Sequence, residues 1–157
     1  MAGLIEKIKR TWWEDKGHRE LLLYAVFGVL TTVVNYAAYW LLTLVFNLRT
    51  EGASEIALIA VNVIAWVLAV AFAYVTNRKY VFESRATGKQ AILREMGLFV
   101  SARLVSLLLF DMLGMYLCIT LFSMNDLLAK LLLNVLVVIF NYIASKLMVF
   151  KKTKTEE

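Results

Sequence analysis

Residues 56–77 read IALIAVNVIAWVLAVAFAYVTN, a segment without a single charged side chain. An α-helix needs about 20 mostly apolar residues to cross the hydrocarbon core of a bilayer, so this segment is long enough to span a membrane. Upstream of it, residues 21–48 form a second uncharged stretch that is longer still. These two stretches predict an all-α integral membrane protein.

The rest of the chain supports this class. Hydrophobic residues make up 61% of the chain, charged residues 18%, and proline is absent, whereas a soluble domain carries more charge and needs turn residues. We expect four transmembrane helices in two hairpins, at residues 21–46, 55–77, 96–122 and 126–148. Ser54 is the expected N-cap of the second helix, and Ser123 and Asp126 have the spacing of a capping box before the fourth.

Few residues are suited to covalent or metal chemistry. The single cysteine, Cys118, lies in an apolar run, and the single histidine, His18, lies in the polar N-terminal segment outside any cluster of metal-ligand spacing. The sequence contains no glycine-rich phosphate loop and no nucleophile motif. We therefore expect neither an enzyme nor a protein with a cofactor or a bound metal ion.

Lysine and arginine are unevenly distributed along the chain. Of the 17 cations, 14 lie in the N-terminal segment, in the link between the hairpins or at the C-terminal end. The positive-inside rule therefore predicts that both termini and the middle link are cytoplasmic. Because topology and anionic lipid account for the net charge of +5, no nucleic-acid partner is expected.

Three parts of the chain follow from these patterns. Residues 1–20 combine an apolar helical face with cations, which predicts an amphipathic helix at the inner membrane surface. Residues 21–150 are expected to form a single membrane domain, made of the hairpins 21–82 and 96–150. Residues 151–157 are expected to form a cytoplasmic tail.

The two hairpins end in nearly the same phrase. Residues 73–82 read AYVTNRKYVF and residues 141–150 read NYIASKLMVF. The positions in register, which share one constant offset along the chain, are Tyr74/Tyr142, Arg78/Lys146, Val81/Val149 and Phe82/Phe150. This match predicts two tandem parallel hairpin repeats related by a pseudo-two-fold axis along the membrane normal. The alternative is that any helix end at a membrane surface collects aromatic and cationic residues.

The second hairpin, unlike the first, carries charges inside the membrane. Ionisable groups there cost several kcal/mol, so they pair, snorkel or line a path. At about 1.5 Å per residue, Arg103 is expected on the order of 10 Å below the inner surface, Asp111 roughly 22 Å and Lys130 roughly 24 Å. Asp111 and Lys130 are therefore predicted to share a level and to form a structural ion pair. Arg103 is expected at the level of Asn141.

Arg103 at this depth suits a phosphate group taken from the lipid headgroup layer. A guanidinium binds phosphate through two hydrogen bonds and stays charged at all relevant pH values. The alternative is an arginine that snorkels to inner-leaflet headgroups without specificity. Asn35 and Asn62 are expected to form interhelical hydrogen bonds. Three glycines are expected to allow close helix approach: Gly28, Gly97 and Gly114.

A family resemblance rests on three stretches: EMGLFVSARLVSLLLFDMLGMYL at 95–117, LLAKLLLNVLVVIFNYIASKLMVFKK at 127–152, and AYVTNRKYVFES at 73–84. With these the chain resembles the GtrA-like family of small four-helix bacterial membrane proteins. The resemblance implies movement of a polyprenyl-phosphate-linked sugar from the inner to the outer leaflet, for cell-surface polysaccharide or cell-wall glycosylation. It implies substrate contacts at Ala73, Asn77, Val81, Phe82, Phe99, Arg103, Lys130 and Asn141. In the second phrase Ser145 and Lys146 replace the Asn-Arg of the first, so substrate binding by both copies stays open.

We therefore predict a flippase for a lipid-linked sugar in the bacterial cytoplasmic (inner) membrane. Its expected partners are the polyprenyl-phosphate sugar, membrane lipids, glycosyltransferases of the same pathway and further copies of the chain in a homo-oligomer. The alternative function is a non-transporting scaffold that anchors a glycosyltransferase, although a scaffold has no need of an arginine at this depth. A small multidrug exporter fits less well, because no acid lies between Glu20 and Glu51.

Overall fold

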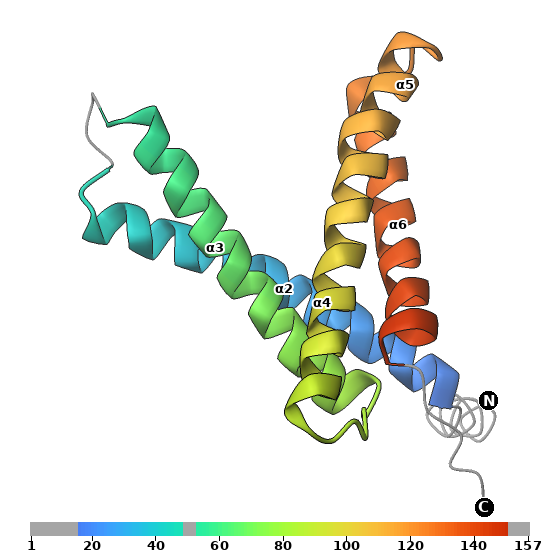
Figure 1. Cartoon of the computed structure of the whole chain (residues 1–157). Coiled ribbons are helices and arrows are strands. Elements are labelled where there is room, and N and C mark those ends of the chain that lie inside the picture. The colour runs from blue at the N-terminus through green and yellow to red at the C-terminus, as the bar shows by residue number, and fades with distance from the viewer. Residues whose placement is uncertain (1–15, 49–52, 151–157) are drawn as a thin grey trace, which may run out of the picture. The chain divides into compact units, whose positions relative to one another are not determined.

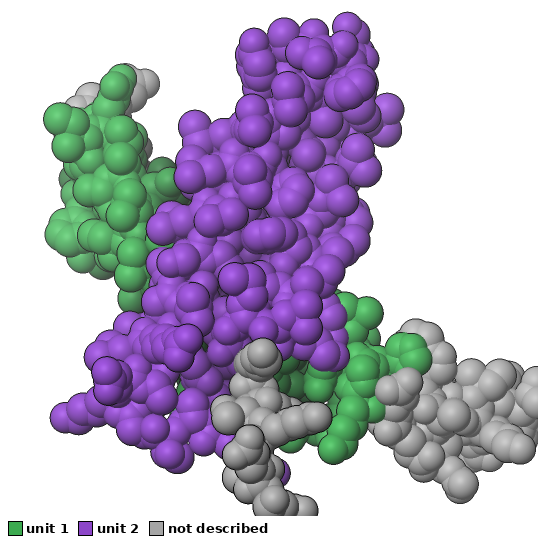
Figure 2. All heavy atoms as spheres, turned by 45° about the vertical axis from the view of Figure 1, so that its right-hand side comes forward, with its two compact units in different colours: residues 1–83 green, residues 84–157 purple. Residues whose placement is uncertain are grey.

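The computed structural model describes residues 16–48 and 53–150. Within them the chain divides between Glu83 and Ser84 into two compact units, which Figure 2 colours separately. Most of the predicted amphipathic segment and the predicted tail lie outside the described residues. Residues 16–20 are described and belong to the first transmembrane helix.

Unit 1 is a helical hairpin. Helix α2 (Lys16–Val45) packs along α3 (Glu55–Thr76), and α3 continues without a break into a π-helix, η1 (Asn77–Val81). Figure 1 shows α2 and α3 as the two arms of this hairpin. The other end of the hairpin holds η1, which also contacts α2.

Unit 2 is a second helical hairpin, whose first arm is one long rod. Helix α4 (Lys89–Ser106) runs into a π-helical segment, η2 (Leu107–Gly114), and then into α5 (Met115–Thr120). After a short turn the chain returns as α6 (Asp126–Ala144), which ends in a third π-helix, η3 (Ser145–Val149). Figure 1 shows α6 running back along this rod.

Four helices in the described residues are long and apolar enough to cross a membrane. They span Lys16–Val45, Glu55–Val81, Lys89–Thr120 and Asp126–Val149, with lengths of 30, 27, 32 and 24 residues. Large apolar side chains cover their outer faces, and Val29, Ile56 and Leu127 are each more than 60% exposed. Such a surface suits lipid, because helices satisfy their backbone polar groups internally. The predicted all-α fold, with four helices long and apolar enough to span a membrane, is confirmed.

The helices extend further at their charged ends than the sequence predicted. Helix α2 begins at Lys16 instead of residue 21, and the third span begins at Lys89 instead of residue 96. Hydropathy marks the apolar part of a helix, whereas helical backbone bonding continues into the polar turns beyond it. Gly88 starts α4 with a φ of 92°, a conformation that glycine adopts without steric cost.

Of the two predicted helix N-caps, the one for α6 is wrong. Ser54 occupies the N-cap position of α3 but makes no side-chain capping bond. The cap of α6 is Asn125, whose side chain accepts a hydrogen bond from the amide of Leu127 at 3.0 Å. Ser123 instead lies in the turn with a φ of 48°, so the expected capping box is not formed.

The two matching phrases adopt the same local structure. The π-helices η1 and η3 are each five residues long, and they start at Asn77 and Ser145, which are equivalent positions of the two phrases. Each is followed by a phenylalanine whose amide donates to the carbonyl five residues back: Phe82 to Asn77 at 2.9 Å, and Phe150 to Ser145 at 2.8 Å. Short π-helical turns inside α-helices frequently occur at functional sites.

Each closing phenylalanine packs on an aromatic ring of the other helix in its own hairpin. In unit 1 the ring centroids of Tyr24 and Phe82 are 6.3 Å apart, and in unit 2 those of Phe99 and Phe150 are 6.1 Å apart. All four side chains are buried. The same end of each hairpin is thus closed by an aromatic pair at a π-helix.

Candidate functional site

Arg103 lies in the last turn of α4 and is half-buried. Its guanidinium carbon stands 5.1 Å from the centre of the Phe99 ring, which is 0% exposed. The two residues are four apart, so they occupy one face of the helix, and the arginine side chain leans back over the phenylalanine. A cation over an aromatic face is attracted by the ring, which restricts where the guanidinium can point.

Ser106 connects Arg103 to α6. Its hydroxyl donates to the Arg103 carbonyl at 2.9 Å and accepts from Asn141 Nδ2 at 3.1 Å. Both Ser106 and Asn141 are buried, and the hydrogen bond between them joins α4 to α6. Ser106 was not among the predicted site residues, although its position three residues after Arg103 places it on the same side of α4.

Asn141 has a second polar atom that this network does not use. Its Oδ1 is buried and has no hydrogen-bond partner among the described residues. An amide oxygen in that state normally attracts a donor, because leaving it unsatisfied away from water costs about 1–3 kcal/mol. Of the predicted substrate contacts, Arg103 thus touches Phe99 with its side chain and is linked to Asn141 through its backbone carbonyl and Ser106.

The contacts along unit 2 define the register of its two arms. The facing pairs are Phe99 with Phe150, Ser106 with Asn141, Phe110 with Phe140, and Gly114 with Leu133. By this register Lys130 lies about seven residues, or about 10 Å, nearer the turn than Asp111. Asn141 likewise lies about four residues nearer the connection between α5 and α6 than Arg103 does.

The predicted ion pair between Asp111 and Lys130 is not formed. The structure has neither an ion pair nor a hydrogen bond at either of these described side chains, and both are exposed. Helical side chains lean toward the start of their helix, so Asp111 and Lys130 lean in opposite directions, away from each other. The predicted common level measured Asp111 from the inner surface and Lys130 from the outer one, whereas, counted from the turn, Asp111 lies nine residues before the end of α5 at Thr120 and Lys130 four residues after the start of α6 at Asp126.

The four predicted contacts of unit 1 also lie together. Ala73, Asn77, Val81 and Phe82 are all buried where α3 passes into η1. Asn77 Nδ2 donates to the Ala73 carbonyl at 2.7 Å, and Asn77 Oδ1 is buried without a partner among the described residues. Unit 1 thus holds a buried amide oxygen of the same kind as that of Asn141 in unit 2.

Lys130 lies apart from the other predicted contacts of its hairpin. It is in the second turn of α6, near the turn that joins α5 to α6, and is exposed. Arg103 lies toward the opposite end of the same hairpin. The structure therefore places the Arg103 guanidinium on Phe99, links the Arg103 backbone to Asn141 through Ser106, and leaves Lys130 as a separate cation at the other end.

Glu95 is a buried carboxylate in a stretch that the sequence marks only as a polar link. It lies on α4, two turns before Arg103, and accepts a hydrogen bond from the Ser84 hydroxyl. The bond ties the start of unit 2 to its first helix. No pattern in the sequence distinguished Glu95 from the exposed charges around it.

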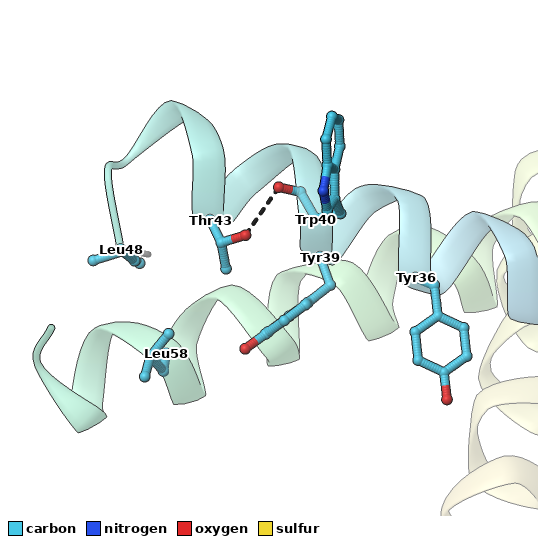
Figure 3. A pocket seen from close by; sticks show the side chains of 6 residues that line it. All are labelled: Tyr36, Tyr39, Trp40, Thr43, Leu48 and Leu58. Carbon is cyan, nitrogen blue, oxygen red and sulfur yellow. Dashed lines mark hydrogen bonds between the residues drawn. The ribbon is translucent and has the colours of Figure 1, made fainter. Parts of the chain in front are cut away.

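A hollow lies at the opposite end of unit 1 from η1. It is lined by Tyr36, Tyr39, Trp40, Thr43, Leu48 and Leu58. In Figure 3 the Tyr39 ring reaches from α2 toward the ribbon of α3, whereas the Trp40 indole points away from α3. Among the described residues there is no group of three or more His, Cys, Asp or Glu side chains that could hold a metal ion.

A chain whose described part has four helices long and apolar enough to span a membrane, with buried amide side chains, a half-buried arginine and no metal cluster, is a small multi-pass membrane protein. The sequence profile of the GtrA/DPMS transmembrane domain matches residues 23–150. The chain belongs to this family, as the resemblance predicted.

Its relatives are small bacterial membrane proteins. The chain is 40% identical to the uncharacterized membrane protein YwcD of Bacillus subtilis over 134 residues, which is 85% of this chain and 98% of that protein. It is 39% identical to the cell wall teichoic acid glycosylation protein GtcA of Listeria monocytogenes over 146 residues, 93% of this chain and 94% of that protein. The protein of the same name from Listeria innocua is 38% identical over the same length. No solved structure matches the chain.

Proposed function

We propose that this protein translocates a polyprenyl-phosphate-linked sugar from the inner to the outer leaflet of the bacterial cytoplasmic membrane. Membership of the GtrA/DPMS family and the relatives named for cell wall teichoic acid glycosylation support this function. A separate glycosyltransferase would use the sugar on the outer side. The chain itself would perform no bond chemistry.

The observation that carries the proposal is the arrangement around Arg103. A half-buried guanidinium rests on the Phe99 ring, and one hydroxyl links its backbone to Asn141, whose amide oxygen is buried without a donor among the described residues. The guanidinium can bind two phosphate oxygens at once, and the amide oxygen can accept a hydrogen bond from a sugar hydroxyl. A sugar phosphate carries both groups: phosphate oxygens for the guanidinium and a hydroxyl donor for the amide oxygen.

The orientation of the chain forms part of the proposal. With both termini and the link around Thr87 in the cytoplasm, Arg103, Asn77 and Asn141 lie in the half of the membrane next to the inner surface. The common π-helix and aromatic pair at the ends of the hairpins support tandem parallel copies in one orientation. The lipid phosphate would then enter from the inner leaflet.

Lys130 is proposed to take over the phosphate on the outer side. It is exposed near the turn end of α6 and lies far from Arg103 along the hairpin. An ammonium binds phosphate as a point charge with little directional demand, which suits a group that must release its ligand. The polyprenyl tail would stay in the lipid throughout, and consumption of the sugar outside would drive net transport.

Replacing Arg103 by lysine tests the phosphate site. Lysine keeps the charge and can snorkel, but it lacks the planar fork, so we expect transport to fall about tenfold or more. Sealed vesicles containing the purified protein would be tested for uptake of a radiolabelled ten-carbon isoprenyl-phosphate sugar. Arg94→Lys is the matched control, because Arg94 is exposed on the same helix.

Helical content and melting temperature would be measured beside uptake, since a half-buried arginine also contributes to packing. Transport at the parental rate by folded Arg103→Lys, with Asn77→Ala and Asn141→Ala equally active, would exclude the inner phosphate site. Full activity of all three variants would make Lys130 the better candidate.

A further inference from the structure

Polar side chains recur every four residues along α2. Thr31, Asn35, Tyr39 and Thr43 stand at this spacing within the helix Lys16–Val45. Residues four apart are neighbours on one helical face, so these four form a continuous polar stripe. All four are half-buried or buried, in contrast to neighbours such as Val29, Val33 and Tyr36. The stripe therefore runs along the inward side of α2.

The stripe does not use its polar groups to bind α3. Thr31 Oγ1 donates to the Phe27 carbonyl at 2.7 Å and Thr43 Oγ1 to the Trp40 carbonyl at 2.9 Å, both within α2. Asn35 Oδ1 is buried and has no partner among the described residues. The predicted interhelical hydrogen bond of Asn35 is thus not formed. A buried amide oxygen without a donor is costly inside a membrane, and a polar residue there is a candidate for a functional site.

One end of the stripe opens into the hollow described above. Tyr39 and Thr43 belong to both the stripe and the hollow. Asn35 lies about 12 Å from Thr43 along the helix, in the direction away from the hollow. Figure 3 shows the Tyr39 ring extending toward α3 beside Leu58, with the Thr43 hydroxyl bonded to the Trp40 carbonyl. The hollow thus combines aromatic and aliphatic surface with a few polar atoms, as small-ligand sites do.

We propose that the polar stripe and the hollow bind the sugar headgroup of the lipid carrier as it leaves toward the outer side. This inference rests on the proposed function and extends it to a second subsite. A sugar ring has an apolar face of C–H groups, which fits the ring of Tyr39, and a rim of hydroxyl donors, which fits Asn35 Oδ1. The occupant is therefore a hydroxyl-rich headgroup rather than an acyl chain, which brings no donor.

The alternative explanation is an aromatic belt at the membrane interface. Belt tyrosines and tryptophans lie at headgroup level, each with its polar tip in water. That explanation accounts for Trp40, whose indole points away from α3. It does not account for Asn35, which lies well inside the span. Because Asn35 Oδ1 is covered in this structure, the sugar reaches it in a state that opens this face of α2.

The test compares binding of two probes to the full chain in detergent micelles. One probe is a ten-carbon isoprenyl phosphate that carries N-acetylglucosamine, and the other is the same isoprenyl phosphate without a sugar. We expect Asn35→Leu and Tyr39→Leu each to weaken binding of the sugar-bearing probe about tenfold, which is the loss of one hydrogen bond or ring contact. Binding of the sugar-free probe should not change.

Asn62→Leu is the matched control, since Asn62 lies on α3, is exposed and is outside both the stripe and the hollow. Replacement of an unsatisfied amide by leucine should not prevent folding, which helical content and melting temperature would verify. Asn35→Ser and Tyr39→Phe give milder versions of both changes. Unchanged binding of the sugar-bearing probe in folded Asn35→Leu and Tyr39→Leu would overturn the inference, and so would equal weakening of both probes.

These outcomes separate the inference from the proposed function. Loss of binding of both probes in Arg103→Lys, with full binding in the Asn35 and Tyr39 variants, would retain the phosphate site and reject the sugar subsite. Absence of transport by the parental protein would reject the proposed function, whatever the stripe binds.

Discussion

Arg103 is constrained by its neighbours before any ligand arrives. The Phe99 ring supports the guanidinium, and the Ser106 hydroxyl bridges the Arg103 carbonyl and the Asn141 amide. This preorganisation matters because a flexible arginine side chain loses conformational entropy on binding a ligand, whereas a side chain that is already held in place loses less. The buried Oδ1 atoms of Asn77 and Asn141 add acceptors that the described part of the fold leaves unused.

The register of unit 2 leads to a prediction about Asp111 and Lys130. Because they lie about 10 Å apart along the hairpin and lean away from each other, their substitutions should act independently. We expect the stability change of Asp111→Asn combined with Lys130→Met to equal the sum of the single changes within about 0.5 kcal/mol. Unfolding free energies in mixed micelles would measure this. A coupling above about 1.5 kcal/mol would restore the ion pair that the sequence suggested.

Sequence reasoning identified part of the site residue by residue. Arg103 and Asn141 were both selected as candidates because a charge and an amide are conspicuous in apolar helices. Ser106 and Glu95 were missed, since a serine in a membrane helix and a glutamate in a charged segment are both ordinary. Their importance comes from contacts with Asn141 and Ser84, which no pattern in the sequence reports.

Among the helices, close packing in unit 2 depends on Gly114. A Cβ added there would lie 2.8 Å from Leu133 Cδ2 and 3.2 Å from the Leu109 carbonyl, whereas nothing lies within 4 Å of the same atom at Gly28 or Gly97. The expected close approach therefore holds for Gly114 and not for the other two. Gly114 also ends η2, where the helix changes from π to α geometry.

Gly114→Ala should therefore destabilise the protein, by about 1–3 kcal/mol, because the Leu133 side chain must shift and the Leu109 carbonyl is crowded as well. Gly97→Ala, the matched control, should leave stability unchanged or raise it by up to about 1 kcal/mol, since alanine favours the helix. Thermal unfolding of both variants in the same detergent would compare them. Equal melting temperatures for the two variants would contradict the contact between Gly114 and α6.

The existence of the four helices could be predicted, and their details could not. Uncharged stretches longer than the span of a bilayer leave few alternatives to a membrane helix. The ends were misplaced by five to seven residues at Lys16 and Lys89, where charged turns continue the helix. The π-helices were not foreseen, because they arise from backbone bonds five residues back and carry no composition of their own.

For the molecule as a whole, the two hairpins repeat a pattern that the sequence suggested in outline. Each has a buried aromatic pair and a five-residue π-helix at one end, at equivalent positions of the two matching phrases. Charge inside the span distinguishes unit 2, and the polar stripe distinguishes unit 1.

The most direct test of the account is transport by the isolated protein. Purified chain in sealed vesicles, with no glycosyltransferase present, would be offered radiolabelled ten-carbon isoprenyl phosphates that carry N-acetylglucosamine, glucose or galactose. The account predicts uptake of at least one of them well above that of protein-free vesicles, with competition by excess unlabelled probe. Uptake no faster than in protein-free vesicles for all three, with the protein folded and inserted, would contradict it and favour the scaffold.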